Sequence, residues 1–227
     1  MNSHIIILEE ASLELVPKRF WNNESCRTVE TKFGLPAQSQ ILDGNFHHKI
    51  ISSIPENEKR GRPDIVHFAL LDIASTPAYQ MDLIRPIIRT INGEVIIVKK
   101  GVRLPRTELR FYGVMSKILR NEAGTDESRL FEYRDSQSME KLLESLNPSR
   151  ILCLSTEGIR RDLNEVVTEL AREVPDNSFA WIVGGFSRGH FSEEVKRLAD
   201  AVISISSFSL AAHVVTARLS YEIERSG

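Results

Sequence analysis

The fold is decided between residues 151 and 205, where three short apolar runs are Ile151-Leu-Cys-Leu154, Phe179-Ala-Trp-Ile-Val183 and Ala201-Val-Ile-Ser-Ile205. Each run has the length and apolar character of a buried strand. Helical patterns at 159–173 and 193–198 separate the runs, and a last helix is predicted over 210–224. Strands that alternate with helices form a parallel sheet covered on both faces. The sequence therefore predicts an α/β fold.

The first part of the chain is less regular. We predict a strand over 4–8 and a helix over 9–20 that Pro17 stops or bends. The stretch 22–61 predicts connecting structure around one short helix. The other expected elements are a helix that Pro63 opens, a strand over 94–99, a helix over 107–120 and a loop over 121–128. No repeat or linker divides the sequence, so we predict a single domain over 1–227 with an inserted α/β extension, placed within 22–62.

Composition excludes several classes of protein. Of the 227 residues, 41% are hydrophobic and 26% are charged, which is ordinary for a globular domain. No apolar run is long enough to cross a bilayer, and the N-terminus lacks the basic start of a signal peptide. Cys26 and Cys153 stand alone, so we expect no disulfide framework, no metal site and a cytoplasmic location. The net charge of −2 gives no general indication of nucleic-acid binding.

Three turns follow the three apolar runs. They are Leu154-Ser-Thr-Glu-Gly158, Gly184-Gly-Phe-Ser-Arg-Gly189 and Ile205-Ser-Ser-Phe-Ser-Leu210. Ligands of open α/β sheets bind beyond the carboxyl ends of the strands, where glycines allow a close backbone approach. The glycine spacing matches neither a dinucleotide fingerprint nor a phosphate-binding P-loop. Each turn alone is equally explained as a tight turn or a helix N-cap, but together they predict one cleft.

A basic segment covers residues 99–110, where five cations stand against one acid. If a helix begins near Arg106, then Arg106 and Arg110 lie on one face and Arg103 projects from the preceding turn. Planar guanidinium groups suit phosphates and base edges. The alternative is a solvated charged face. Asp64, in the first turn of the Pro63 helix, is explained by the helix dipole or by a role in holding an arginine.

These segments resemble the ribosome-assembly pseudouridine methyltransferases of the SPOUT superfamily, which act at ring nitrogen 1. The matching stretches are Gly61-Arg-Pro-Asp-Ile65, Leu70-Leu-Asp72, Val102-Arg-Leu-Pro-Arg-Thr107, Arg110-Phe111, Val183-Gly-Gly-Phe-Ser-Arg-Gly189 and Ile205-Ser-Ser-Phe-Ser-Leu-Ala-Ala212. The arginine stretch is the most specific of them. Ser209 departs from the family, where proline is frequent. The N-terminal extension of many eukaryotic members is missing, which favours the archaeal type.

The resemblance implies a C-terminal trefoil knot, an S-adenosylmethionine cofactor, a homodimer and small-subunit ribosomal RNA as the partner, with ribosomal assembly proteins as further partners. Carried over by position, the cofactor contacts are Leu154, Gly184, Gly189, Ile205, Ser206, Ser207, Phe208, Ser209 and Leu210. The implied RNA contacts are Arg62, Arg103, Arg106 and Arg110, with Asp64 orienting an arginine.

The implied chemistry suits these residues. Methyl transfer from a sulfonium needs no metal, only alignment of donor and nucleophile. Arg103 and Arg106 are candidates for stabilising the charge that develops when the base loses its proton, and no general base is assigned. Two alternatives stay open. One is a non-catalytic RNA-binding assembly factor that uses the same arginines, and the other is a small-molecule enzyme whose glycine turns bind a nucleotide.

Overall fold

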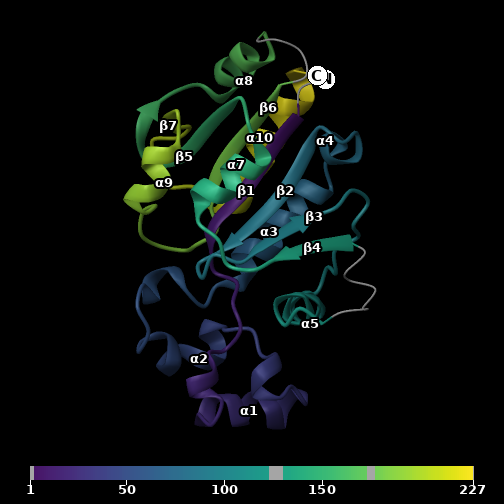
Figure 1. Cartoon of the computed structure of the whole chain (residues 1–227), viewed down its shortest axis with the longest axis vertical. Helices are drawn as coiled ribbons and strands as arrows, with labels where there is room; N and C mark the ends of the chain where they lie inside the picture. Colours follow the sequence, from purple (N-terminus) through teal and green to yellow (C-terminus); the bar gives the residue numbers. More distant parts are fainter. Residues whose placement is uncertain (1–2, 123–129, 173–176, 227) are drawn as a thin grey trace.

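The computed structural model describes residues 3–122, 130–172 and 177–226. They are organised around one seven-stranded sheet with the order β4-β3-β2-β1-β6-β5-β7 (Figure 1). The strands are β1 (Ser3–Ala11), β2 (Ile84–Thr90), β3 (Val95–Val98), β4 (Phe131–Arg134), β5 (Arg150–Arg160), β6 (Ser178–Gly184) and β7 (Ala201–Ser204). The five strands from β2 to β7 in this order are parallel, whereas β3 and β4 join antiparallel at one edge. The α/β class is confirmed, and the antiparallel edge is an addition that the sequence analysis did not predict.

Helices cover both faces of the sheet. They are α3 (Pro63–Ala74), α4 (Pro77–Gln80), α5 (Glu108–Leu119), α7 (Met139–Leu146), α8 (Leu163–Ala171), α9 (Glu193–Leu198) and α10 (Ala212–Ser226). Side chains alternate along β1, because successive residues of a strand point to opposite faces. Ile6 and Leu8 therefore pack in the core with α3, α5, α8 and α10, while Ile5 and Ile7 pack in the core with α7 and α9.

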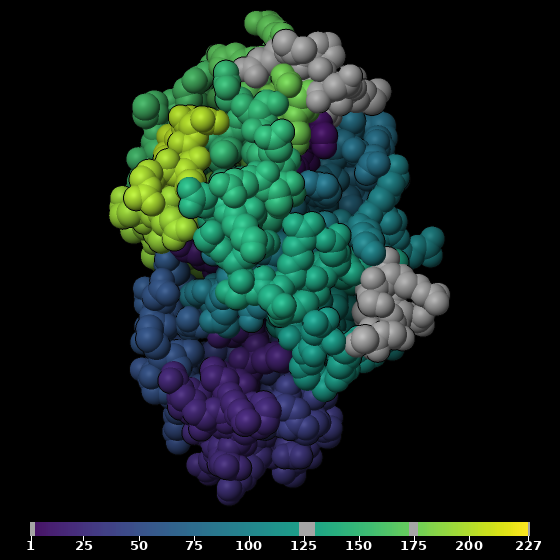
Figure 2. Space-filling model, in the orientation of Figure 1, coloured from purple at the N-terminus to yellow at the C-terminus, as the bar shows by residue number. Residues whose placement is uncertain are grey.

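A small helical lobe lies between β1 and α3, at the lower end of the molecule in Figures 1 and 2. It contains α1 (Glu24–Phe33), α2 (Gly44–Ile51) and the 3-10 turns Lys18–Phe20, Ala37–Ser39 and Asn57–Lys59. Cys26, Leu42 and Ile50 are buried in a core of its own. The prediction of one short helix in this stretch was wrong, because apolar residues far apart in sequence meet to support two helices. The inserted extension is helical apart from a single β-bridge between Leu15 and Ile41, so its expected α/β character is not found among its described residues.

The helix predicted over 9–20 is absent. Strand β1 continues through Glu9 and Glu10 to Ala11, and both carboxylates are buried. Each meets a cation from a distant element, Arg89 for Glu9 and Lys59 for Glu10. Such partners cannot be seen in a local pattern, so a stretch that mixes acids with Leu13, Leu15 and Val16 was predicted as a helix where the buried strand continues.

Several elements were missed, among them the short helix α4. Strand β2 contains Pro86, which usually argues against a central strand. It is tolerated because β3 pairs with β2 only from Ile87 to Arg89, so Pro86 has a strand neighbour on one side alone. Strand β4 and helix α7 were also not predicted. The loop expected over 121–128 lies, from residue 123 on, outside the described residues.

Strand β5 has an irregularity that shapes the site. Leu154 and Ile159 both align with Ile203 of β7, so residues 155–158 bulge out of the pairing. The helix predicted from 159 therefore begins only at Leu163, and the last helix begins at Ala212. The trefoil knot stays a prediction. Within the described residues, no helix is long and apolar enough to cross a membrane.

Candidate functional site

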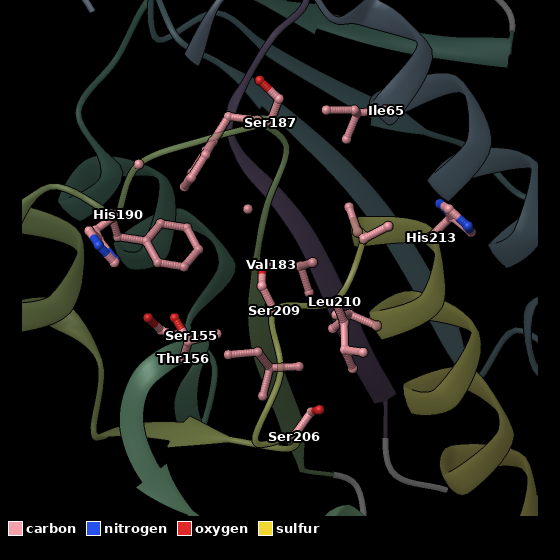
Figure 3. A pocket seen from close by; sticks show the side chains of 18 of the residues that line it. Ile65, Ser155, Thr156, Val183, Ser187, His190, Ser206, Ser209, Leu210 and His213 are labelled. Atoms are coloured by element: carbon pink, nitrogen blue, oxygen red, sulfur yellow. The ribbon is translucent and has the colours of Figure 1, made fainter. Parts of the chain in front are cut away.

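A cavity of about 440 Å³ lies beyond the carboxyl ends of β5, β6 and β7. These strands are neighbours in the sheet, so their turns come together as the sequence analysis expected. Of the predicted cofactor contacts, the cavity is lined by Leu154, Gly184, Gly189, Ile205, Ser206, Phe208, Ser209 and Leu210, while Ser207 is outside the lining. Figure 3 shows Ser155 and Thr156 of the β5 bulge facing Ser206 and Ser209 of the last loop across this space.

The cavity walls combine apolar and hydroxyl-bearing side chains. Leu154, Val183 and Leu210 give apolar surface, and Ser155 and Thr156 add hydroxyl groups. Ligand pockets typically enclose about 300–1,000 Å³ and are mainly apolar with a few polar groups. The cavity therefore fits a nucleoside-sized ligand that has flat apolar faces and polar edges.

The glycine turn 184–189 is fixed to the end of β1. The Gly185 amide donates to the Glu9 carbonyl (2.8 Å), and the Ser12 amide donates to the Gly185 carbonyl (2.8 Å). A Cβ at position 185 would lie 2.7 Å from the Ala11 Cα, so only glycine fits there. Gly189 has a φ of +94°, a conformation that side-chain-bearing residues rarely adopt. Gly184 was predicted as a cofactor contact, whereas Gly185 was not, because the contact of Gly185 with β1 joins residues far apart in sequence.

Arg62 and Asp64 both line the cavity and bind each other. The Arg62 Nε donates to Asp64 Oδ1 and its Nη2 donates to Oδ2, both at 2.8 Å. This bidentate hydrogen bond with Asp64 is the main reason why the pKa of the Arg62 guanidinium is raised. Arg62 is thus the arginine that Asp64 binds in this structure. The backbone adds to the restraint, because the Arg62 amide donates to Ser12 Oγ (2.7 Å).

The other predicted RNA contacts lie outside the cavity lining. Arg103, Arg106 and Arg110 are exposed, and within the described part of the chain none of them has a hydrogen-bonded or charged partner. Helix α5 begins at Glu108, after the N-cap Thr107. The premise that Arg106 and Arg110 share a helix face was therefore wrong, because Arg106 precedes the helix.

Two buried contacts hold the backbone of this arginine segment. His67 Nε2 lies 2.7 Å from the Pro105 carbonyl oxygen, and the His67 ring stacks on Phe111 with centroids 4.4 Å apart. At the other end, the Tyr79 hydroxyl donates to the Lys99 carbonyl (2.6 Å). The segment is thus anchored to α3 and α4 by its backbone, while its guanidinium groups stay free for solvent or a ligand.

Several lining residues were not predicted. His213 of α10 lies between α10 and α3 in Figure 3, and its ring centroid is 6.2 Å from that of Phe68. His190 approaches the Glu157 carboxylate (3.3 Å), whose pKa is lowered by the hydrogen bond from Lys196. His213 reaches the cavity only through the packing of α10 against α3, so no motif could identify it. His190 directly follows Gly189 in the glycine turn, but it was not predicted as a contact.

The comparisons with known proteins agree with this geometry. The crystal structure of Archaeoglobus fulgidus Nep1 bound to S-adenosylhomocysteine superimposes with a TM-score of 0.81 at 30% identity, covering 99% of this chain and 98% of that one. The ribosomal RNA small subunit methyltransferase Nep1 of Staphylothermus marinus is 31% identical over 215 residues, 94% of this chain and 92% of the relative. The Archaeoglobus fulgidus relative of the same name is 31% identical over 228 residues, with 99% and 97% covered.

The fold and the cavity at three adjoining strand ends define an α/β methyltransferase of the SPOUT class. The family model described as EMG1/NEP1 methyltransferase matches residues 6–224. The chain belongs to the EMG1/NEP1 methyltransferase family.

Proposed function

We propose that this protein uses S-adenosylmethionine to methylate ring nitrogen 1 of a pseudouridine in small-subunit ribosomal RNA. The observation that carries the proposal is the position of the Arg62–Asp64 pair on the wall of the cavity formed by the β5, β6 and β7 turns. A cofactor site and a cationic group for the substrate thereby meet in one place. Small-subunit rRNA methylation is the activity named for the relatives.

In this proposal the three turns hold the cofactor, mainly through Leu154, Gly184, Gly189 and the loop 205–210. When bound, S-adenosylmethionine supplies an electrophilic methyl group. The protein's part is to orient the base and to stabilise charge. Because Asp64 holds the Arg62 guanidinium, this cation is preorganised to face the negative charge that develops as ring nitrogen 1 loses its proton.

Arg103, Arg106 and Arg110 have a different part in the proposal. They are exposed and lie outside the cavity lining, so they would contact the RNA around the target nucleotide. Charge stabilisation by Arg103 or Arg106 would require the base to reach beyond the cavity. The target base must leave any stack to enter the cavity, which favours a loop of the RNA.

The decisive experiment compares two RNAs of one loop sequence that differ only in carrying uridine or pseudouridine at the target. With labelled S-adenosylmethionine, we expect methyl incorporation only into the pseudouridine RNA. Tight binding of both RNAs with no incorporation would reject the proposal and favour the non-catalytic assembly factor. Binding of cofactor with no RNA affinity would favour a small-molecule enzyme.

We also propose a cytoplasmic homodimer of one-domain chains, with the insertion in the helical lobe. Phe68 on α3 and Tyr221 on α10 are 42% and 57% exposed, and α3 packs against α10, which leaves apolar surface for a second copy. Leu219 and Ile223 of α10 are buried within the chain itself, so they are not part of this surface. Light scattering at micromolar concentration tests the dimer, and a monomer would contradict it.

A further inference from the structure

Lys59 lies between a buried carboxylate and the glycine turn. Its Nζ is 2.6 Å from Glu10 Oε2, and the two side chains are only 7% and 10% exposed. On its other side, Nζ lies 5.1 Å from the centre of the Phe186 ring. A Cβ built on Gly189 would be 3.4 Å from the Lys59 Cε. Lys59 therefore lies beside the turn that lines the cavity, although it does not itself line the cavity.

Glu10 connects this lysine to the other end of the same loop. Its Oε1 accepts the amide of Ser192, the residue before α9, at 2.9 Å. Both carboxylate oxygens are thus engaged, one by the helical lobe and one by the chain that leaves the glycine turn. Glu10 also has a φ of +49°, which non-glycine residues seldom adopt. Strained residues of this kind persist where surrounding contacts determine the conformation.

The stretch of chain from Glu58 to Asp64 contacts both parts of the proposed site. At its start, the Glu58 carbonyl accepts the Ser187 hydroxyl of the glycine turn (3.1 Å). At its end, Arg62 and Asp64 form the cavity wall. We refer to residues 58–64 as the connecting segment. Its two ends thus contact the glycine turn and the cavity wall, whereas the Arg60 side chain between them contacts neither.

We propose that Lys59, paired with Glu10, is a positioning residue that holds the glycine turn in its cofactor-binding shape. This inference rests on the proposed function of the cavity. The Lys59 ammonium group lies beside Phe186 and Gly189 of the turn. Glu10 binds both this ammonium group and the backbone amide of Ser192. Without the pair, the turn loses its support from the helical lobe.

The neighbouring residue provides a matched control. Arg60 forms an equally buried pair with Glu14 at 2.6 Å, with side chains 11% and 2% exposed. That pair also joins the helical lobe to the region after β1, but Arg60 bonds Pro55 and Asn92 rather than the glycine turn. Both pairs should matter for stability, whereas only the Glu10–Lys59 pair should affect the cofactor turn.

The test compares the double variant Glu10→Gln/Lys59→Met with Glu14→Gln/Arg60→Met. Changing both partners avoids leaving a buried charge alone, which would itself unfold the protein. We expect the first variant to weaken S-adenosylhomocysteine binding by about tenfold, the usual order when a charge-assisted hydrogen bond is removed, and the second to leave it within about twofold. Lys59→Arg, which retains the cation, should bind nearly as the parent does.

Hydrogen exchange of the protein without ligand gives a readout that does not depend on the proposed function. Amides of residues 185–192 should exchange faster in Glu10→Gln/Lys59→Met than in Glu14→Gln/Arg60→Met, when each variant is measured the same number of degrees below its own melting temperature. Equal exchange in the two variants would overturn the positioning role. A parent protein that binds no S-adenosylhomocysteine would instead reject the proposed function, while the exchange result would still decide the role of Lys59.

Discussion

The cavity and the arginine segment, which we propose as the cofactor site and the RNA site, are prepared by opposite means. The cavity is formed by turns whose shape is fixed by strand order, by close backbone packing at Gly185 and by a positive φ at Gly189. The arginine segment presents Arg103, Arg106 and Arg110 as exposed side chains, and only its backbone is anchored, at Pro105 and Lys99. One site depends on shape and the other on charge.

This difference determines how each site should respond to mutation and salt. A site made of backbone tolerates many side-chain changes but fails where a glycine is replaced. A site made of exposed cations loses affinity in increments, one charge at a time, and is screened by salt. The Arg62–Asp64 pair stands between these extremes, since a charged side chain is held by a second side chain on the cavity wall.

The largest effect is expected from Gly189→Val. A β-branched residue cannot adopt a φ of +94° without strain, so the turn must change shape. We expect S-adenosylhomocysteine affinity to fall by at least about 100-fold, roughly 2.7 kcal/mol, as measured by calorimetry. RNA affinity should change little, because the exposed arginines are untouched.

Gly34→Val is the matched control for this change. Gly34 also has a positive φ, +67°, at the end of α1, but it lies in the helical lobe and no atom approaches its Cβ position within 4 Å. It should lower stability without affecting the cofactor. Unchanged cofactor affinity in a folded Gly189→Val protein would remove the glycine turn from the site.

A smaller effect is expected at each exposed arginine. Arg103→Ala, Arg106→Ala and Arg110→Ala should each weaken RNA binding by about tenfold, because each removes a charge-assisted hydrogen bond to the RNA. If the arginine binds a phosphate, its removal should also lower the slope of log affinity against log salt by about 0.7. Cofactor affinity should remain at the parent value in all three variants.

Arg85→Ala is the control for the arginine variants. Arg85 is exposed too, but it lies beside Ile5 of β1 at the amino-terminal ends of the parallel strands, whereas the cavity lies beyond carboxyl ends of such strands. It should leave RNA binding unchanged. If the parent affinity ignored salt between dilute and physiological buffer, the contrast between a shape-based and a charge-based site would be abolished.

The sequence could predict those parts of the fold and site that depend on local patterns, but not those that depend on contacts between distant residues. The strands at 151–154, 179–183 and 201–205 were predicted because short apolar runs between helices carry their own local signal, and their turns then had to meet. The buried pairs Glu9–Arg89 and Glu10–Lys59 join residues 80 and 49 positions apart, so no local pattern could indicate them. The strand end at Ala11, the two helices of the lobe and the role of Gly185 all depend on such distant contacts and were missed.

The smallest effect, and the one that tests the intermediate case, is expected from Asp64→Asn. The Arg62 side chain is 52% exposed and that of Asp64 is 20% exposed, so solvent screens their ion pair. Pairs of this kind contribute about 0.2–1 kcal/mol, and we therefore expect RNA affinity to fall by no more than about fivefold. Asparagine keeps the shape and one acceptor oxygen but removes the charge that holds the guanidinium at two points. Most of the methylation rate at saturating RNA should remain, because Arg62 is still present and can be drawn into place by the substrate.

Arg62→Ala should lower RNA affinity more than Asp64→Asn does. Adding Asp64→Asn to Arg62→Ala should have almost no further effect on RNA affinity, since an aspartate that acts through an arginine has nothing left to orient. Single-turnover methylation at saturating RNA provides the measurement. A rate that collapses in Asp64→Asn while RNA affinity stays normal would make Asp64 the proton acceptor, and the pair would then belong to the chemistry rather than to substrate binding.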